Sequence, residues 1–249
     1  MSVSSYFRPQ KDSSGPLVFS QTGSIAPKIA IHIHSLVRGL ILNPAYPCVF
    51  ARSAVNKDAY RFALYESMTD NNSLSSFAQD FAEFVADQDS KAELSQEFST
   101  FLVSFLTPRS TNEVQFEGYL WEVLNGLHAL DTVAWDATTT SDPDSPLFSF
   151  SFAGRSYFVI GLHGGASRFS RIFPYPTLVF NAHRQFQTLK DEGKFESSQT
   201  TIRKRDTLIQ GSINRSLTDY GNDSEAKQYS GRHVEPEWKC PFKPKKKGA

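Results

Sequence analysis

The sequence has few cysteines and no long apolar run. Cys48 and Cys240 are the only cysteines among its 249 residues, which is too few for the disulfide framework of a small secreted domain. No stretch of about 18 apolar residues is present, so we expect no transmembrane helix. The first residues lack a basic start followed by an apolar block, which argues against a secretory signal. These absences predict a cytoplasmic protein that does not contact membranes.

The sequence also has no excess of charge of either sign. Its 26 Lys and Arg residues balance its 26 Asp and Glu residues, so no global electrostatic field attracts nucleic acid. The exception is a basic tail, residues 243–249, which we interpret as a solvated, frayed end. Residues 1–27 are rich in Ser, Gly and Pro and predict a flexible arm. The intervening residues 28–242 have the length of a single globular domain with a substantial core.

Apolar periodicity predicts a mainly helical N-terminal half. Residues 28–43 are typical of a helix that stops at Asn43-Pro44. The alternation in the same segment leaves a strand open, in which His32 and His34 would share a face and bind a metal ion. A strand is expected at Tyr60–Ser67. Further helices are expected at residues 74–85, 90–107 and 110–130, the last two opened by Ser-x-x-Glu capping patterns at Ser90/Glu93 and Ser110/Glu113.

The C-terminal half predicts a small sheet. Apolar runs at residues 147–152 and 156–162 flank a Gly-containing turn and predict a β-hairpin, and residues 176–183 predict a third strand. A long helix is expected over residues 198–217 and a short one over 224–229. The expected fold class is therefore α+β, with a helical N-terminal half packed on a small, mostly antiparallel sheet in one domain.

The loop after the predicted hairpin carries the densest set of chemical groups. His163 is followed by Gly164 and Gly165, which have no side chains and let a flat ligand approach closely. Arg168 and Arg171 are spaced to pair with two carboxylates or a phosphate. Haem needs an axial base, a slot and cations for its propionates, and therefore fits this set. A phosphate-bearing ligand fits all but the histidine, and a turn with surface arginines is the simplest alternative.

A row of polar side chains borders the apolar stripe of the predicted 198–217 helix. The row consists of Arg203, Asp206, Gln210 and Asn214. Such groups cost about 1–3 kcal/mol each when they are buried without a hydrogen-bond partner. We therefore expect them to find partners in residues 220–232 or in a ligand, and a purely structural network is the alternative.

Carboxylates and cysteines supply further candidates. Asp223 and Glu225 would bind a cationic substrate, or would favour the dipole at the start of a short helix. Cys48 and Cys240 both lie among Pro and aromatic residues. A thiolate at either position would ligate iron, whereas a buried thiol would be inert.

Long strings of this sequence resemble the YqcI/YcgG family over residues 44–242. They are "AYPCVFAR", "GLHGGASRFSRIFPYPTLVFNAHRQFQTLKDEGKFE" and "IRKRDTLIQGSINRSLTDYGNDSEAKQYSGRHV". The resemblance implies a haem b enzyme that uses dioxygen or peroxide, with an electron donor where dioxygen is used. It would N-hydroxylate a guanidine group of arginine or of an arginine-derived compound. It implies no nucleic-acid partner and leaves a homodimer open.

The resemblance also implies roles for particular residues. His163 is expected to be the axial ligand of the haem iron, with His183 or a cysteine as alternatives, and Arg168 and Arg171 to pair with the propionates. The remaining candidates are Gly164, His183 and Arg232 for the cofactor, Asp223 and Glu225 for the guanidinium, and Arg203, Gln210 and Tyr229 as catalytic residues that position the oxidant or the substrate. Ile172 stands where the family often has an arginine, which implies fewer propionate contacts.

Two other functions stay open on the sequence. A haem-binding sensor or carrier without turnover would need the same cofactor residues. A cysteine-dependent hydrolase would pair Cys48 with His183, provided that the fold brings them together.

Overall fold

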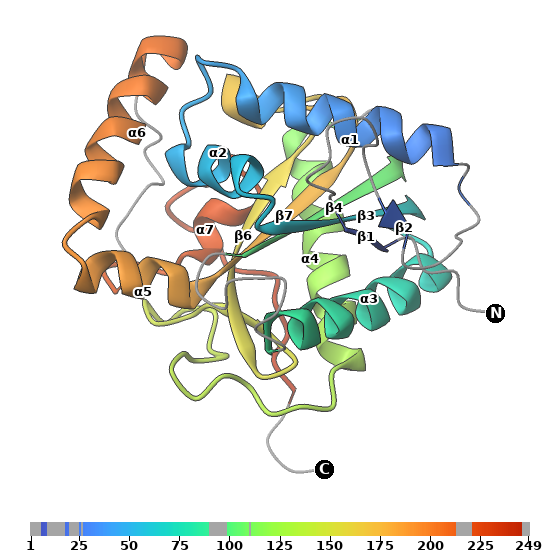
Figure 1. Ribbon diagram of the computed structural model, residues 1–249. Coiled ribbons are helices and arrows are strands. Elements are labelled where there is room, and N and C mark those ends of the chain that lie inside the picture. The colour runs from blue at the N-terminus through green and yellow to red at the C-terminus, as the bar shows by residue number, and fades with distance from the viewer. Residues whose placement is uncertain are drawn as a thin grey trace.

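The structure, a computed structural model, describes residues 6–8, 18, 19, 25, 27–89, 99–109, 111–212 and 221–245. In this part of the chain a seven-stranded sheet lies between two layers of helices (Figure 1). The strands are β1 (Tyr6–Arg8), β2 (Val18–Phe19), β3 (Tyr60–Ser67), β4 (Thr100–Thr107), β5 (Phe150–Phe152), β6 (Arg155–Leu162) and β7 (Thr177–Ala182). Their order across the sheet is β2-β1-β3-β4-β7-β6-β5. β3 and β4 pair in parallel, and the other neighbours pair antiparallel.

Helices cover both faces of this sheet. They are α1 (Pro27–Leu42), α2 (Val49–Asn56), α3 (Asn71–Asp89), α4 (Glu113–Leu130), α5 (His183–Asp191), α6 (Phe195–Gln210) and α7 (Ala226–Tyr229), with a 3-10 turn η1 (Phe169–Arg171). α3 and α4 pack on one face, and α1 and α2 on the other. α6 contacts α2, α5 and η1 at the edge of the second layer (Figure 1). None of the helices in the described residues is long and apolar enough to span a bilayer.

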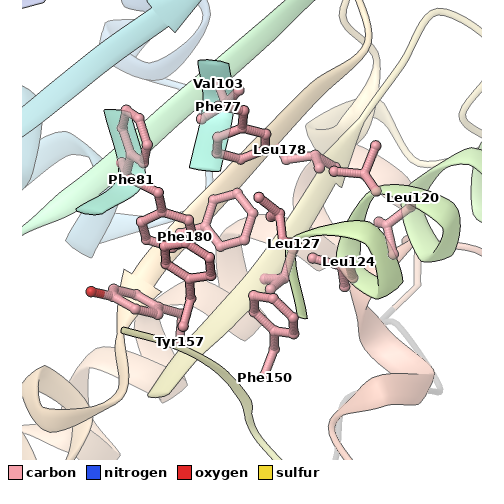
Figure 2. Close-up of a cluster of buried hydrophobic side chains, with 14 of the residues drawn as sticks. Phe77, Phe81, Val103, Leu120, Leu124, Leu127, Phe150, Tyr157, Leu178 and Phe180 are labelled. Carbon is pink, nitrogen blue, oxygen red and sulfur yellow. The ribbon is translucent and has the colours of Figure 1, made fainter. Parts of the chain in front are cut away.

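The larger core lies between the sheet and helices α3 and α4. Phe81 of α3 is at its centre, with ring centroids 4.7 Å from Phe152, 5.0 Å from Tyr157 and 4.8 Å from Phe180. Figure 2 shows this aromatic group beside Leu120, Leu124 and Leu127 of α4. Aromatic side chains bury large areas, so the space between this face of the sheet and helices α3 and α4 is filled by packed side chains.

The predicted α+β class is confirmed, and the sheet is mostly antiparallel as expected. The predicted hairpin and third strand are β5, β6 and β7. The sheet is larger than expected, because β1 to β4 come from the N-terminal half.

The helix predicted up to Pro108 is wrong over residues 100–107, which form β4. Phe101, Val103 and Phe105 face the core under α3, while Leu102 faces the opposite layer. A strand covered on both faces is apolar almost throughout, and such a run cannot be told from a buried helix by its pattern alone. The expected Ser90/Glu93 capping box lies outside the described residues. At the start of α4 the capping box uses Asn112 and Gln115 rather than Ser110 and Glu113.

The predicted flexible arm is wrong for residues 6–8 and 18–19, which form β1 beside β3 and β2 beside β1. Tyr6 is buried and its hydroxyl donates to Asp87 over 2.8 Å. The Asp87 carboxylate also accepts from Arg8 and Arg61, at 2.9 Å each. The Asp87 carboxylate on α3 therefore holds residues 6–8 against the sheet. Residues 1–5, 9–17, 20–24 and 26 lie outside the described residues.

The other helical predictions hold with two changes. Residues 27–42 are a helix in which His32 is exposed and His34 buried, so the metal-binding strand alternative fails. α6 was predicted to run to residue 217, but it ends at Gln210 and is followed by Gly211, whose φ of 75° is left-handed. Residues 213–220, with Asn214, lie outside the described residues, as do residues 246–249 of the basic tail. Neither α2 nor α5 was predicted.

Candidate functional site

A cavity of about 260 Å³ lies between the sheet and the second helical layer. Its floor is the face of β4, β6 and β7 that is turned away from α3 and α4. Its walls come from α1, α2, α5 and α6. The cavity exists because α1 and α2 cover one part of this face and α5 and α6 another, so that side chains from both groups meet over the strands.

Two rows of side chains cross the cavity floor. The register pairs Tyr60 with Thr100 and Thr100 with Asn181, which makes a polar row. The adjacent row is apolar and consists of Leu102, Val179 and Ile160. Within the polar row Thr100 Oγ1 donates to Asn181 Oδ1 over 3.1 Å. The floor therefore has a hydrogen-bonding end and an apolar middle.

Aromatic side chains and a histidine form one wall. Phe186 of α5 lies edge-on to Phe50 of α2 and Phe158 of β6, with ring centroids 6.1 and 6.0 Å away. His183 begins α5 directly after β7 and lines the cavity. Burial lowers the pKa of His183, so its imidazole is neutral near pH 7 and keeps the nitrogen lone pair that a metal requires.

Cys48 lines the cavity from the start of α2. Its Sγ accepts from the Ala51 amide over 3.4 Å and caps the helix. Burial raises the pKa of the Cys48 thiol, so the protonated form dominates at neutral pH. A thiol is neither a strong nucleophile nor a metal ligand, because both roles need the thiolate. This environment disfavours the Cys48–His183 hydrolase, although both residues line the same cavity.

The loop before η1 is tied to α6 by the polar row predicted on that helix. Arg168 pairs with Asp206 and donates to Ser212 O over 3.2 Å. Gln210 accepts from the Phe169 amide over 2.9 Å and donates to Ser167 O over 3.2 Å. The expectation that this row needs partners is therefore confirmed for Asp206 and Gln210. The partners are in residues 167–169, rather than in residues 220–232.

Replacing Gln210 by Ala is expected to loosen this loop without unfolding the protein. Two hydrogen bonds to backbone groups are lost, and a net contribution of about 1 kcal/mol corresponds to roughly fivefold faster exchange of the Phe169 amide. Hydrogen exchange followed by NMR measures this rate. Thr207→Ala, one turn earlier on the exposed side of α6, is the matched control. Equal exchange in both variants would contradict the role given to Gln210.

Arg171 also lines the cavity, but its guanidinium is largely engaged. It donates to Gly161 O over 3.0 Å, and to Gln228 O and Tyr229 O over 3.3 and 3.4 Å. These bonds hold α7 against the end of β6. Since an arginine has five donors, some remain for a ligand anion.

Glu225 is a buried carboxyl group at the cavity wall. The Tyr229 hydroxyl donates to its Oε1 over 2.5 Å and accepts from the Phe150 amide over 3.0 Å. Burial raises the pKa of Glu225 to about 8, so the group is largely protonated near pH 7. Tyr229 itself is stacked on Trp121 in the larger core and does not line the cavity. Tyr229 therefore orients the Glu225 carboxyl group from the side of the larger core.

His163 lies on the opposite side of the sheet from the cavity. Its ring stacks on Phe116 of α4, with centroids 4.2 Å apart. The Gly165 amide donates to Nδ1 over 3.3 Å, and burial lowers the pKa of His163. A neutral ring that accepts at Nδ1 carries its proton on Nε2, which leaves no lone pair for iron. The reason is the alternation of β6, because Leu162 faces the cavity and the next residue faces α4.

Three other candidate residues contact protein groups outside the cavity. Arg232 bonds Glu117 over 2.8 Å and Glu235 over 2.7 Å. Asp223 forms a partly exposed ion pair with Lys227 at 2.8 Å. Cys240 packs against the core under α4 rather than beside the cavity.

The structure thus brings part of the predicted set together. The cavity is lined by Arg168, Arg171, His183, Arg203 and Glu225, and not by His163, Gly164, Gln210, Asp223, Tyr229 or Arg232. The sequence reasoning missed the polar floor residues Tyr60, Thr100 and Asn181. Their signal was a hydrogen-bonding side chain at an inward position of an otherwise apolar strand. In the described residues no group of three or more His, Cys, Asp and Glu side chains is arranged to hold a metal ion.

Comparison with known proteins matches residues 37–243 to the YqcI/YcgG family. The chain belongs to this family. Two members similar to it are the uncharacterized proteins YcgG and YqcI of Bacillus subtilis (strain 168), each 28% identical over 207 residues that cover 79% of this chain and 80% of the relative. A third relative, from Streptomyces lavendulae, is named as N(omega)-hydroxy-L-arginine synthase DcsA. It is 28% identical over 122 residues, 48% of this chain and 45% of DcsA. No solved structure matches significantly.

Proposed function

We propose that this protein is a haem-dependent N-hydroxylase of a guanidine-bearing compound, and that the cavity above β4, β6 and β7 is its active site. The observation that carries the proposal is the combination of a neutral imidazole, an apolar floor, arginines and a buried carboxyl group in one cavity. The relative named as a hydroxyarginine synthase supports the reaction class.

The cavity residues fit a haem group by their chemistry. His183 would offer a nitrogen to the iron, and Arg168, Arg171 and Arg203 would offer cations for the propionates. Leu102, Val179 and Ile160 offer the apolar surface on which a macrocycle packs. Of the two residues, His183 rather than Cys48 would bind the iron, because burial favours the ligating form of the imidazole and the non-ligating form of the thiol. Haem would supply the iron that activates the oxidant.

The protein's own groups would hold the substrate. Glu225 faces the cavity with a carboxyl oxygen fixed by Tyr229, and two carboxylate oxygens match the forked donors of a guanidinium. A bound cation favours the ionised carboxylate, so substrate binding would release the Glu225 proton. Hydroxylation by dioxygen takes up two electrons and two protons and releases water, whereas peroxide supplies the same oxidising equivalents by itself.

The proposal is tested by absorbance and by product analysis. Protein produced in haem-sufficient cells is expected to show a Soret band. With arginine and either peroxide or dioxygen plus a reductant, it is expected to yield hydroxyarginine by mass spectrometry. A Soret band without any hydroxylated product from a panel of guanidines would favour the sensor or carrier function. Absence of the band after haem is supplied would end the haem proposal.

A further inference from the structure

A groove on the outer surface between α2 and α6 is lined by cations. Arg52 and Lys57 come from α2 and the residue that follows it, and Arg205 comes from α6. The other polar side chains are Ser53 and Asn56, and among the described residues no acidic side chain lines the groove. Arg52 and Arg205 are half-buried, and Lys57 is exposed. The groove is separate from the cavity, because the two share no lining residue.

The protein's own acids do not neutralise these cations. In the part of the chain that the structure describes, no carboxylate forms an ion pair with Arg52, Lys57 or Arg205. The Arg52 guanidinium donates to Pro44 O over 3.4 Å, which leaves its charge uncompensated. The groove therefore presents three positive charges to the solvent or to a partner.

The sequences of the two helices explain this local excess of charge. α2 contains no acidic residue. The first acidic residue of α6, Glu196, lies about 14 Å along the helix axis from Arg205. The second, Asp206, is buried and pairs with Arg168 on the cavity side. Because the whole chain has equal numbers of acidic and basic residues, the groove is a cationic patch on a neutral molecule and attracts anionic partners.

The groove and the cavity lie on different sides of the same two helices. Ala51 and Val55 of α2 and Ile202 of α6 line the cavity, whereas Arg52 and Arg205 line the groove. α2 and α6 lie side by side and contact each other (Figure 1). A helix with its side chains is about 10–12 Å across. A partner docked in the groove would therefore be about one helix diameter from a group bound in the cavity.

The proposed reaction needs a partner of this kind when dioxygen is the oxidant, because two electrons must then reach the cavity from outside. Encounters between redox proteins bury small surfaces, below about 1,200 Å² in total. Complementary charge increases their rate of association. A compact cationic groove beside the cavity suits such an encounter, whereas a permanent interface is larger and more apolar.

We propose that the groove between α2 and α6 docks an acidic one-electron carrier protein, which delivers electrons to a haem bound in the cavity. This inference rests on the proposed function with dioxygen as the oxidant. Two reduced carriers are oxidised for each dioxygen. One oxygen atom is inserted into the N–H bond of the guanidine, and the other leaves as water with two protons from the solvent.

The first test measures docking by calorimetry, with the full chain both haem-loaded and haem-free. A plant-type ferredoxin and a flavodoxin are the acidic probes, and a basic cytochrome c is the probe of opposite charge. We expect both acidic carriers to bind at low ionic strength and to dissociate as salt screens the charges. The basic carrier is expected not to bind.

Charge reversal locates the docking surface. The double variant Arg52→Glu/Arg205→Glu is expected to weaken binding of the acidic carriers roughly 10-fold or more, because each exposed ion pair contributes up to about 1 kcal/mol. Lys239→Glu reverses an exposed cation outside the groove and is the matched control, with binding expected to equal that of wild type.

The second test follows reduction of the haem-loaded protein by the acidic carriers, using stopped-flow absorbance. The double variant is expected to be reduced about as many times more slowly as its binding is weakened. Product formation driven by peroxide needs no carrier and is expected to be unchanged. Loss of the peroxide-driven reaction in the double variant would show that the substitutions disturb the cavity, and would overturn the inference.

The remaining outcomes separate this inference from the proposed function. Binding that does not depend on salt, or that falls equally in Lys239→Glu, would overturn the docking surface. Hydroxylation with peroxide by a wild type that binds neither acidic carrier would overturn the inference and leave the proposed function standing. Absence of a Soret band after haem is supplied would end both.

Discussion

Replacing Glu225 by Gln is expected to leave the free energy of unfolding unchanged at pH 4 and to raise it at pH 9 by about 5 kcal/mol. The carboxyl group is buried, and burial raises its pKa from 4.5 to about 8. Gln has the same shape, keeps the oxygen that accepts from Tyr229, and never ionises. Denaturant unfolding of both proteins across this pH range measures the difference.

The sign follows from the protons bound in each state. Between pH 4.5 and about 8 the unfolded chain has released the Glu225 proton and the folded protein retains it. The free energy of unfolding of the wild type therefore falls with rising pH by about 1.4 kcal/mol per pH unit in this window. Above pH 8 the buried carboxylate is ionised in the folded state, and the full penalty is present. The free energy of unfolding of Glu225→Gln is expected to lack this pH dependence.

Asp223→Asn is the matched control, since it removes a carboxylate only two residues away that is partly exposed and paired with Lys227. We expect a change of less than about 0.5 kcal/mol at either pH. A stability difference between Glu225→Gln and wild type that is the same at pH 4 and pH 9 would contradict the buried, protonated state of Glu225. It would also weaken the case for proton release on substrate binding.

Replacing His183 by Ala is expected to abolish stoichiometric haem binding, with the affinity for haem falling on the order of 100-fold. The side chain lies in the cavity wall at the start of α5, and its neutral imidazole is the ligating form. Haem content per chain, measured after reconstitution, checks this without any assay of turnover. Because His183 is at a helix start and only half-buried, the fold is expected to survive, and circular dichroism confirms that.

His163→Asn is the control for this prediction. It alters the other histidine of the same sequence region, which stacks on Phe116 away from the cavity, and is expected to keep its haem. The reverse result, haem lost from His163→Asn and kept by His183→Ala, would restore the ligand predicted from the sequence. A thiolate-type spectrum that disappears in Cys48→Ser would assign the iron to Cys48 instead.

Much of the fold could be predicted from local pattern. The hairpin of β5 and β6, the strand β7 and the helices α1, α3 and α4 follow from periodicity that a single element must satisfy by itself. Residues 100–107 could not be assigned in this way. They form a central strand covered on both faces, so the pattern lacked the alternation that marks a half-exposed strand.

The candidate site, like the fold, could be predicted only in part from the sequence. By itself the sequence determined the family and the polar row on α6 that needs partners. It also determined which residue types are available between Gly161 and Arg232. Only the tertiary structure decided which of them meet. His163 and His183 are both next to strands of the same sheet, yet one faces α4 and the other the cavity. The physical reason is that a side chain's face depends on strand register and on the helix packed there, which are set by contacts between residues far apart in the chain.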